Sequence, residues 1–131
     1  QAARTDSSYH FSDAFEYFSK GLEIRKLTLG ETHPDTAWSY QSIGLWHFYQ
    51  GEYEKAIENY QNCLNIRKMI LQPSHAYTAE ILYLLGEAYL KIHQIQSAKE
   101  HLLLAEKIQS DLHKVKALEK TQQLLNECSL S

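Results

Sequence analysis

The sequence predicts an all-α protein, an α-solenoid of antiparallel helix pairs that ends in a C-terminal capping helix. Three observations favour this fold class. The chain repeats itself with a step of 42 residues, as from Ala14 to Ala56 (56 − 14 = 42). Apolar residues recur at three- and four-residue steps, which is the spacing of one face of a helix. Only 2 prolines and 5 glycines occur in 131 residues, too few for the turns of a β-sandwich or barrel.

The internal repeat divides the chain into units. When residues 11–51 are compared with residues 53–93, eleven of the 41 positions are identical. Repeats of this length are typical of solenoids in which helix pairs stack on their neighbours. The units are a polar N-terminal segment expected to be disordered or a truncated helix (1–10), a half repeat (11–29), two full repeats (33–71 and 75–109), and a capping helix with its tail (110–131).

Each full repeat contains two predicted helices. The first helices run roughly from Pro34 to Gln50 and from Ala76 to Ile92. Pro34 suits the first turn of a helix, where its missing N–H would have no partner in any case. The second helices carry apolar stripes at helical spacing, whose recurring members are Phe11, Ala14, Phe15, Phe18 and Leu22, then Tyr53, Ala56, Ile57, Tyr60, Leu64 and Met69, then Ile95, Ala98, Leu102, Ala105 and Ile108.

Small residues hold fixed places in the repeat. The three series are Ala14, Ala56 and Ala98, then Gly21, Cys63 and Ala105, then Gly44 and Gly86. A glycine inside a helix costs about 1 kcal/mol relative to alanine, so it needs a packing reason. We expect paired helices to cross closely at these residues, with Phe18, Tyr60 and Leu102 beside the crossing. Cys63 is then a packing residue rather than a reactive thiol.

The last predicted helix follows Ser110-Asp111. Its apolar face is expected to hold Leu112, Val115, Leu118 and Leu125, and its solvated face Lys114, Lys116, Glu119 and Lys120. This pattern is typical of a helix that closes the end of a repeat array.

The sequence predicts neither an enzyme nor a metal or cofactor site. No two of the seven histidines are three or four residues apart, so none share a helix face as a ligand pair would. His33 and His75 directly precede a helix, where capping or packing of the connection is the simpler role. No Gly-x-Ser-x-Gly elbow, phosphate loop or His-Glu-x-x-His motif occurs.

Charge and hydropathy narrow the partners and the compartment. A net charge of −3 lacks the basic footprint of a nucleic-acid binder. The longest apolar runs are too short to cross a bilayer, so no membrane partner is predicted. The two cysteines are far apart, and no signal-peptide pattern opens the chain, so we expect a cytoplasmic protein. Because the first residue is Gln, we expect an excised segment or a processed chain.

One run of residues resembles a tetratricopeptide repeat. It contains Gly44, Gly51, Tyr53, Ala56 and Tyr60, followed by Leu64-Asn65-Ile66-Arg67-Lys68. The segment Leu22-Glu23-Ile24-Arg25-Lys26 … Leu29-Gly30-Glu31-Thr32-His33-Pro34-Asp35-Thr36-Ala37 is similar to the long repeats of kinesin light chains. The resemblance covers about residues 11–109. It implies a non-catalytic scaffold that binds a peptide or helix of a protein partner in a concave groove.

The resemblance also implies which residues face that groove. They are Trp38, Gln41, Ser42, Leu45 and Tyr49 in the first full repeat and Glu80, Tyr83, Leu84, Glu87 and Lys91 in the second. The three aromatic members are the expected anchors, because aromatic side chains bury large areas and keep a polar handle. Alternatively, some of them pack against an absent neighbouring repeat or a flanking domain.

The partner is expected to be basic or apolar rather than acidic. The Asn-Asn pair of kinesin-light-chain repeats is replaced by Gln41-Ser42 and Tyr83-Leu84, and Glu80 and Glu87 have only Lys91 nearby. A weak homodimer through the exposed N-terminal end is also predicted. The alternative function is a structural tail of a larger enzyme, for example a SET-MYND-type lysine methyltransferase, packing on its own catalytic domain.

Overall fold

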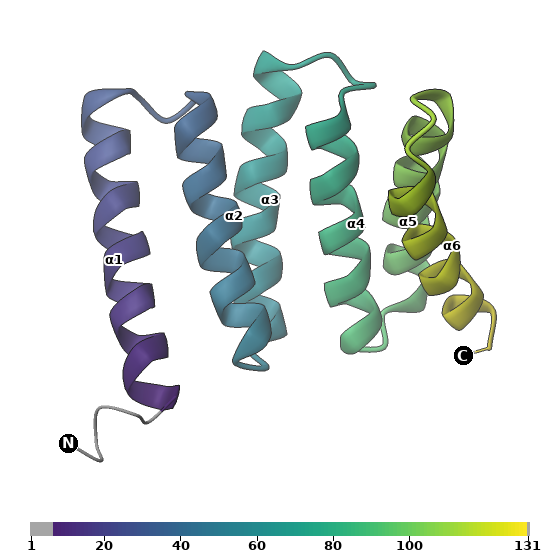
Figure 1. Ribbon diagram of the computed structural model, residues 1–131, viewed down its shortest axis with the longest axis horizontal. Coiled ribbons are helices and arrows are strands. Elements are labelled where there is room, and N and C mark those ends of the chain that lie inside the picture. Colours follow the sequence, from purple (N-terminus) through teal and green to yellow (C-terminus); the bar gives the residue numbers. More distant parts are fainter. Residues whose placement is uncertain (1–6, 131) are drawn as a thin grey trace.

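The computed structural model describes residues 7–130, with the side chains described from residue 13 onward. Its helices are α1 (Ser7–Thr28), α2 (Pro34–Tyr49), α3 (Tyr53–Ile70), α4 (Ala76–Lys91), α5 (Ile95–Asp111) and α6 (Val115–Leu130). They stand side by side in chain order, each antiparallel to the one before it (Figure 1). The predicted all-α solenoid is confirmed. None of the helices within residues 7–130 is long and apolar enough to cross a membrane.

Consecutive helices form the main packing contacts, and α4 also reaches α6. The core lies between these layers and includes Ala56, Tyr60 and Leu102, each of which is fully buried. A solenoid of this kind is stabilised chiefly by contacts between neighbouring units. The first helix of each full repeat, α2 or α4, packs most extensively on the second helix, α3 or α5.

The predicted close crossings are present at two glycines. A Cβ atom built on Gly44 would lie 2.6 Å from the ring of Tyr60 and 3.3 Å from the carbonyl oxygen of Ala56. A Cβ atom on Gly86 would collide with the side chain of Leu102 in the same way. Glycine is therefore favoured at these positions, because a Cβ would force the large side chain of the partner helix to shift.

The ends of the helices are fixed by local hydrogen bonds. His33 and His75 are the N-caps of α2 and α4, and each Nδ1 accepts a hydrogen bond from the backbone N–H two residues later, at 3.0 Å. This agrees with the predicted capping role. The turns from α2 to α3 and from α4 to α5 contain Gly51 (φ 79°) and His93 (φ 61°) in the left-handed region.

The two ends of the chain differ in detail from the sequence analysis. Helix α1 already begins at Ser7, within the segment 1–10, whose first six residues lie outside the described part, as does the side chain of Phe11. The predicted apolar face of the last helix was wrong at Leu112 and Val115, which are 40% and 63% exposed. Helix α5 continues to Asp111, so Leu112 falls in the connection.

Helix α6 instead buries two residues of smaller size. They are Thr121 and Cys128, and the hydroxyl of Thr121 donates a hydrogen bond of 2.7 Å to Oε1 of the buried Gln109. The connection from α5 to α6 has only three residues and places His113 at φ 57°. This short turn sets the rotation of α6 and thereby decides which of its faces meets α5.

Candidate functional site

A central groove lies where α2, α4 and α6 face one another, with a volume of about 490 Å³. The close crossings pack α2 on α3 and α4 on α5, while α2 also contacts α1 and α4 also contacts α3 and α6. The groove is lined by Gln41, Leu45, Ala76, Tyr77, Ala79, Glu80, Tyr83, Leu84, Gln109, Leu112, Lys114, Lys116, Ala117 and Lys120. Leu45, Tyr83 and Leu84 give it an apolar floor, with charged groups of Glu80 and Lys120 beside them.

The ten residues predicted from the resemblance separate into three sets. Five of them line the central groove, namely Gln41, Leu45, Glu80, Tyr83 and Leu84. Trp38 and Ser42 line a second hollow, the N-terminal notch, between α1 and α2. Tyr49, Glu87 and Lys91 line neither hollow. The structure therefore brings half of the predicted set together.

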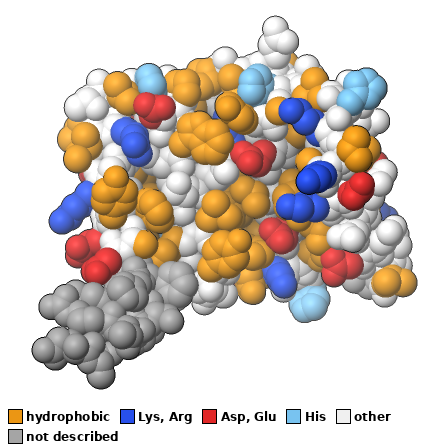
Figure 2. All heavy atoms as spheres, in the orientation of Figure 1, with side chains coloured by type: hydrophobic (Ala, Val, Ile, Leu, Met, Phe, Trp, Pro, Cys, Tyr) orange, Lys and Arg blue, Asp and Glu red, His pale blue; other side chains and the backbone are white. Residues whose placement is uncertain are grey.

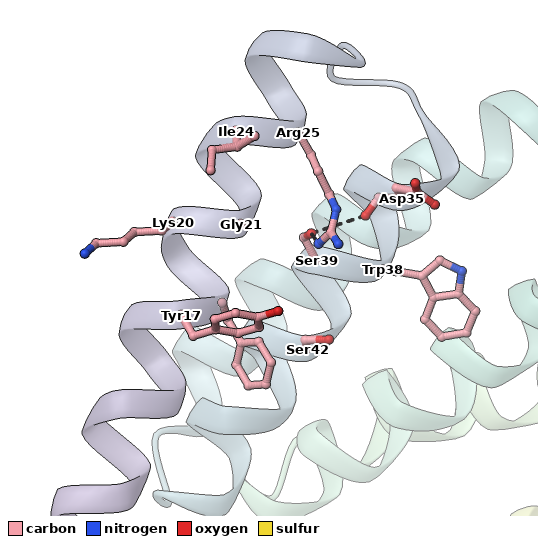
Figure 3. Close-up of a pocket in the computed structure, with 10 residues that line it drawn as sticks. Tyr17, Lys20, Gly21, Ile24, Arg25, Asp35, Trp38, Ser39 and Ser42 are labelled. Carbon is pink, nitrogen blue, oxygen red and sulfur yellow. Dashed lines mark hydrogen bonds between the residues drawn. The ribbon is translucent and has the colours of Figure 1, made fainter.

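The N-terminal notch has a volume of about 760 Å³ (Figure 3). Helix α1 contributes Tyr17, Phe18, Lys20, Gly21, Ile24 and Arg25, and α2 contributes Asp35, Trp38, Ser39 and Ser42. In Figure 3 the side chain of Arg25 extends from α1 toward Ser39 on α2. Its Nη1 donates a hydrogen bond of 2.7 Å to Oγ of Ser39, which ties the two helices together at one end of the notch.

A buried arginine stands behind the groove. Arg67 on α3 is 2% exposed, and its guanidinium carbon lies 4.5 Å from the ring centroid of Trp38 and 5.5 Å from that of Tyr77. Its Nη1 donates to Oε1 of Gln41 at 2.8 Å and to the carbonyl oxygen of Tyr77 at 3.0 Å, whereas its Nη2 has no hydrogen-bond partner. Aromatic faces and neutral oxygens surround this cation, an arrangement that favours guanidinium.

Gln41 connects the buried arginine to the groove. Its Oε1 accepts from Arg67, and its Nε2 donates to Oε1 of Glu80 at 3.4 Å. The two contacts fix the orientation of the amide group, because only the oxygen can accept from a guanidinium. Glu80 is exposed at the groove while Gln41 is buried, so the carboxylate is held in place from behind.

Three lysines of the groove were missed by the sequence reasoning, which assigned them to a solvated face. They are Lys114, Lys116 and Lys120, and all three line the central groove. Figure 2 shows basic side chains gathered at the α6 end of the face, next to hydrophobic side chains over the middle helices. One signal could have found them: a second step of 42 residues along the series of Gly44 and Gly86 reaches Cys128 (86 + 42 = 128), which marks α6 as another first helix.

Burial changes the protonation of groups along α4. Desolvation raises the pKa of the Glu87 carboxyl, and the charge of Glu127 adds to this, while Lys91 and Lys120 oppose it. Desolvation also raises the pKa of the Tyr83 phenol, helped by Glu87. Tyr83 therefore remains a neutral hydrogen-bonding group with an apolar ring, as a peptide contact would require.

The remaining chemistry is that of packing. Burial raises the pKa of the Cys63 thiol to about 12, so the thiolate needed for nucleophilic attack is scarce at neutral pH. Cys63 is fully buried, in agreement with its predicted packing role. The part of the chain that the structure describes contains no group of three side chains able to hold a metal ion. The hollows offer surfaces for binding.

The chain belongs to the tetratricopeptide repeat family. A family model described as tetratricopeptide repeat matches residues 11–69 and again residues 41–111. Among curated proteins, "Protein fem-1 homolog A" of Rattus norvegicus is 29% identical over 91 residues, which are 70% of this chain. A fem-1 homologue of Drosophila melanogaster is 31% identical over 77 residues, or 59% of this chain. The chain spans 14% of the rat protein and 12% of the fly protein.

Solved structures show the same fold. A putative kinesin light chain of Podosopora anserina, with nearly identical TPR-like repeats, superposes with a TM-score of 0.84 at 22% identity; the match covers 97% of this chain and 61% of that one. BtubC from P. vanneervenii superposes with a TM-score of 0.76 at 15% identity, over 92% of this chain and 56% of that one. The predicted similarity to kinesin-light-chain repeats is confirmed for the fold.

Proposed function

We propose that the chain is a non-catalytic protein-interaction scaffold that binds a peptide or helix of a protein partner in the central groove. The tetratricopeptide fold suggests a scaffold of this kind. The observation that carries the proposal is the groove between α2, α4 and α6, where Tyr83 and Leu84 lie half-buried between charged groups of opposite sign. Aromatic side chains that become fully buried on binding supply much of the affinity of such surfaces.

The charges of the groove suggest the chemistry of the partner. Glu80 stands on the α4 side, and Lys114, Lys116 and Lys120 stand on the α6 side. The prediction of a basic or apolar partner rested on the charges of α4 alone and left out the lysines on the α6 side. With both sides included, we propose an apolar segment whose basic residue meets Glu80 and whose acidic residue meets the lysines. Opposite charges at two edges fix the direction in which a peptide binds.

The predicted aromatic anchors differ in how much of their surface is left to contact a partner. Trp38 packs against Arg67 and against Tyr77, with ring centroids 5.1 Å apart in an edge-to-face arrangement. Trp38 is 37% exposed, so part of its surface is already used inside the chain. We therefore propose Tyr83 as the principal anchor. Trp38 then serves mainly to pack α2 against Arg67 and Tyr77 of the same chain.

Selection of peptides from a display library with the purified chain tests this function. Replacement of Tyr83 by alanine is expected to weaken selected peptides at least about tenfold, because it removes a half-buried aromatic contact. The change Lys120→Glu is expected to weaken them and to remove much of their salt dependence. Leu103→Ala is the matched control, since Leu103 is exposed on α5 outside the groove. Peptides that bind the wild type and all three variants equally would refute groove binding.

A further inference from the structure

The N-terminal notch occupies a position that is filled elsewhere in the same chain. One repeat step of 42 residues carries Phe18 to Tyr60 and Arg25 to Arg67 (67 − 25 = 42), and it carries α2 to α4. The notch between α1 and α2 thus corresponds to the space between α3 and α4. At the second place, α2 covers the face of α3 that corresponds to the open face of α1. Gly44 packs against Tyr60, and Gln41 and Trp38 cover Arg67.

Equivalent side chains differ sharply in exposure at the two places. Ile24 is 60% exposed, whereas its equivalent Ile66 is 5% exposed. Arg25 is exposed, whereas Arg67 is 2% exposed, and the half-buried Gly21 corresponds to the fully buried Cys63. The residues on α1 have the character of a buried interface, but within residues 7–130 no helix covers them as α2 covers their equivalents on α3. An apolar helix face without its partner marks a binding surface.

We propose that the N-terminal notch is the docking site for one amphipathic helix of a partner protein, packed on α1 as α2 packs on α3. Its chemistry follows from the equivalent contacts. Phe18 holds the place of Tyr60 and Leu102, each of which packs against a glycine, so the incoming helix carries a glycine or alanine at its crossing. Opposite Arg25 it carries a carboxylate or amide oxygen, as Gln41 does for Arg67.

Other occupants fit less well. Residues 1–6 are too few, because α2 and α4, the helices that fill equivalent places, have 16 residues each. A second copy that paired α1 with α1 would set Lys20 and Arg25 of both chains against each other, and like charges disfavour such an isologous contact. An extended peptide would leave the crossing beside Phe18 unfilled. A helix with an acidic or amide group satisfies both the shape and the charge of the notch.

A synthetic peptide of residues 33–51 is a direct probe, since it is the helix that fills the equivalent place. Labelled at its N-terminus and titrated with the 131-residue chain, it is expected to bind with saturation in fluorescence anisotropy. The same peptide with Gly44→Leu is expected to bind at least about tenfold more weakly, because the added side chain would strike Phe18.

Two variants of α1 make a matched pair. Ile24→Glu places a carboxylate inside the notch and is expected to weaken the probe at least about tenfold, whereas Leu27→Glu lies on the same helix outside the notch and is expected to leave binding unchanged. Both residues are mostly exposed, so thermal melts should show folded proteins. Equal binding to both variants, absence of probe binding, or a dimer of the chain alone that Ile24→Glu dissociates would each overturn the proposal.

Discussion

Two helical glycines of this chain have opposite packing environments. At Gly44 a Cβ would meet the Tyr60 ring at 2.6 Å, whereas at Gly21 it would meet nothing nearer than Nη1 of Arg25 at 3.6 Å. Gly44→Ala should therefore lower the free energy of unfolding by about 1–3 kcal/mol through overpacking. Gly21→Ala should raise it by about 0.5–1 kcal/mol, because alanine is the better helix former.

Urea denaturation of the two variants measures this difference, and each serves as the control for the other. The contrast also tests the repeat alignment, since Gly21 shares its series with Cys63 and Ala105 and not with Gly44. Equal effects of the two substitutions would contradict the close crossing of α2 and α3.

A second contrast concerns backbone conformation. His93 (φ 61°) and Gly51 (φ 79°) occupy equivalent turns, and side chains other than glycine are strained in this left-handed region. His93→Gly should stabilise the protein by about 1 kcal/mol, and Gly51→Ala should destabilise it by a similar amount. Nothing lies within 4 Å of a Cβ at Gly51, so the loss would come from the backbone alone. Thermal unfolding of both variants checks the sign, and loss of stability in His93→Gly would contradict this account.

The helices themselves could be predicted because each carries its own pattern. The bounds of α2 and α4 agree with the prediction to within a residue at each end, and the Gly44 crossing follows from size alone. Contacts made by α6 could not be predicted in this way. Thr121 and Cys128 of α6 hold the positions that Ala79 and Gly86 hold one repeat before them in α4. The residues at these positions stay small but are no longer identical, so the repeat is hard to recognise in α6. Lys116 and Lys120 of α6 line the groove because α6 holds the place of another first helix.

The boundary between α4 and α6 has a pH-dependent effect on stability. Desolvation raises the pKa of Glu87 in the folded state above 4.5, the ordinary value that we take for the unfolded state. Between the unfolded-state pKa and the folded-state pKa, the folded protein keeps a proton on Glu87 that the unfolded protein has released. Stability from this group is therefore lost as the pH rises through that window. Glu87→Gln should be more stable than the wild type at neutral pH, and the difference should vanish as the pH falls below 4.5.

Thermal melts of both proteins across that range measure the effect. Glu58→Gln is the matched control, because Glu58 is exposed in the middle of α3 and its replacement should change the melting temperature little at any pH. A gain in stability of Glu87→Gln that grew on acidification would have the wrong sign.

The molecule as a whole should open from its N-terminal end. Helix α1 packs chiefly on α2, whereas α3, α4 and α5 are each packed between two neighbours, and the exposed Tyr17, Ile24 and Leu27 show how little of α1 is covered. In an array stabilised by neighbouring contacts, the least covered unit has the lowest opening free energy. Native-state hydrogen exchange should therefore show weaker protection in α1 than in α3 or α4.

Leu22 provides the sharper test, because it is the one buried side chain in the described part of α1. Leu22→Ala should lower the opening free energy of α1 by about 2 kcal/mol or more. It should leave α4 and α5 unchanged, since the packing there does not pass through α1. If protection fell equally in all helices, the chain would unfold as one cooperative unit. Helix α1 would then not open independently of the rest of the array.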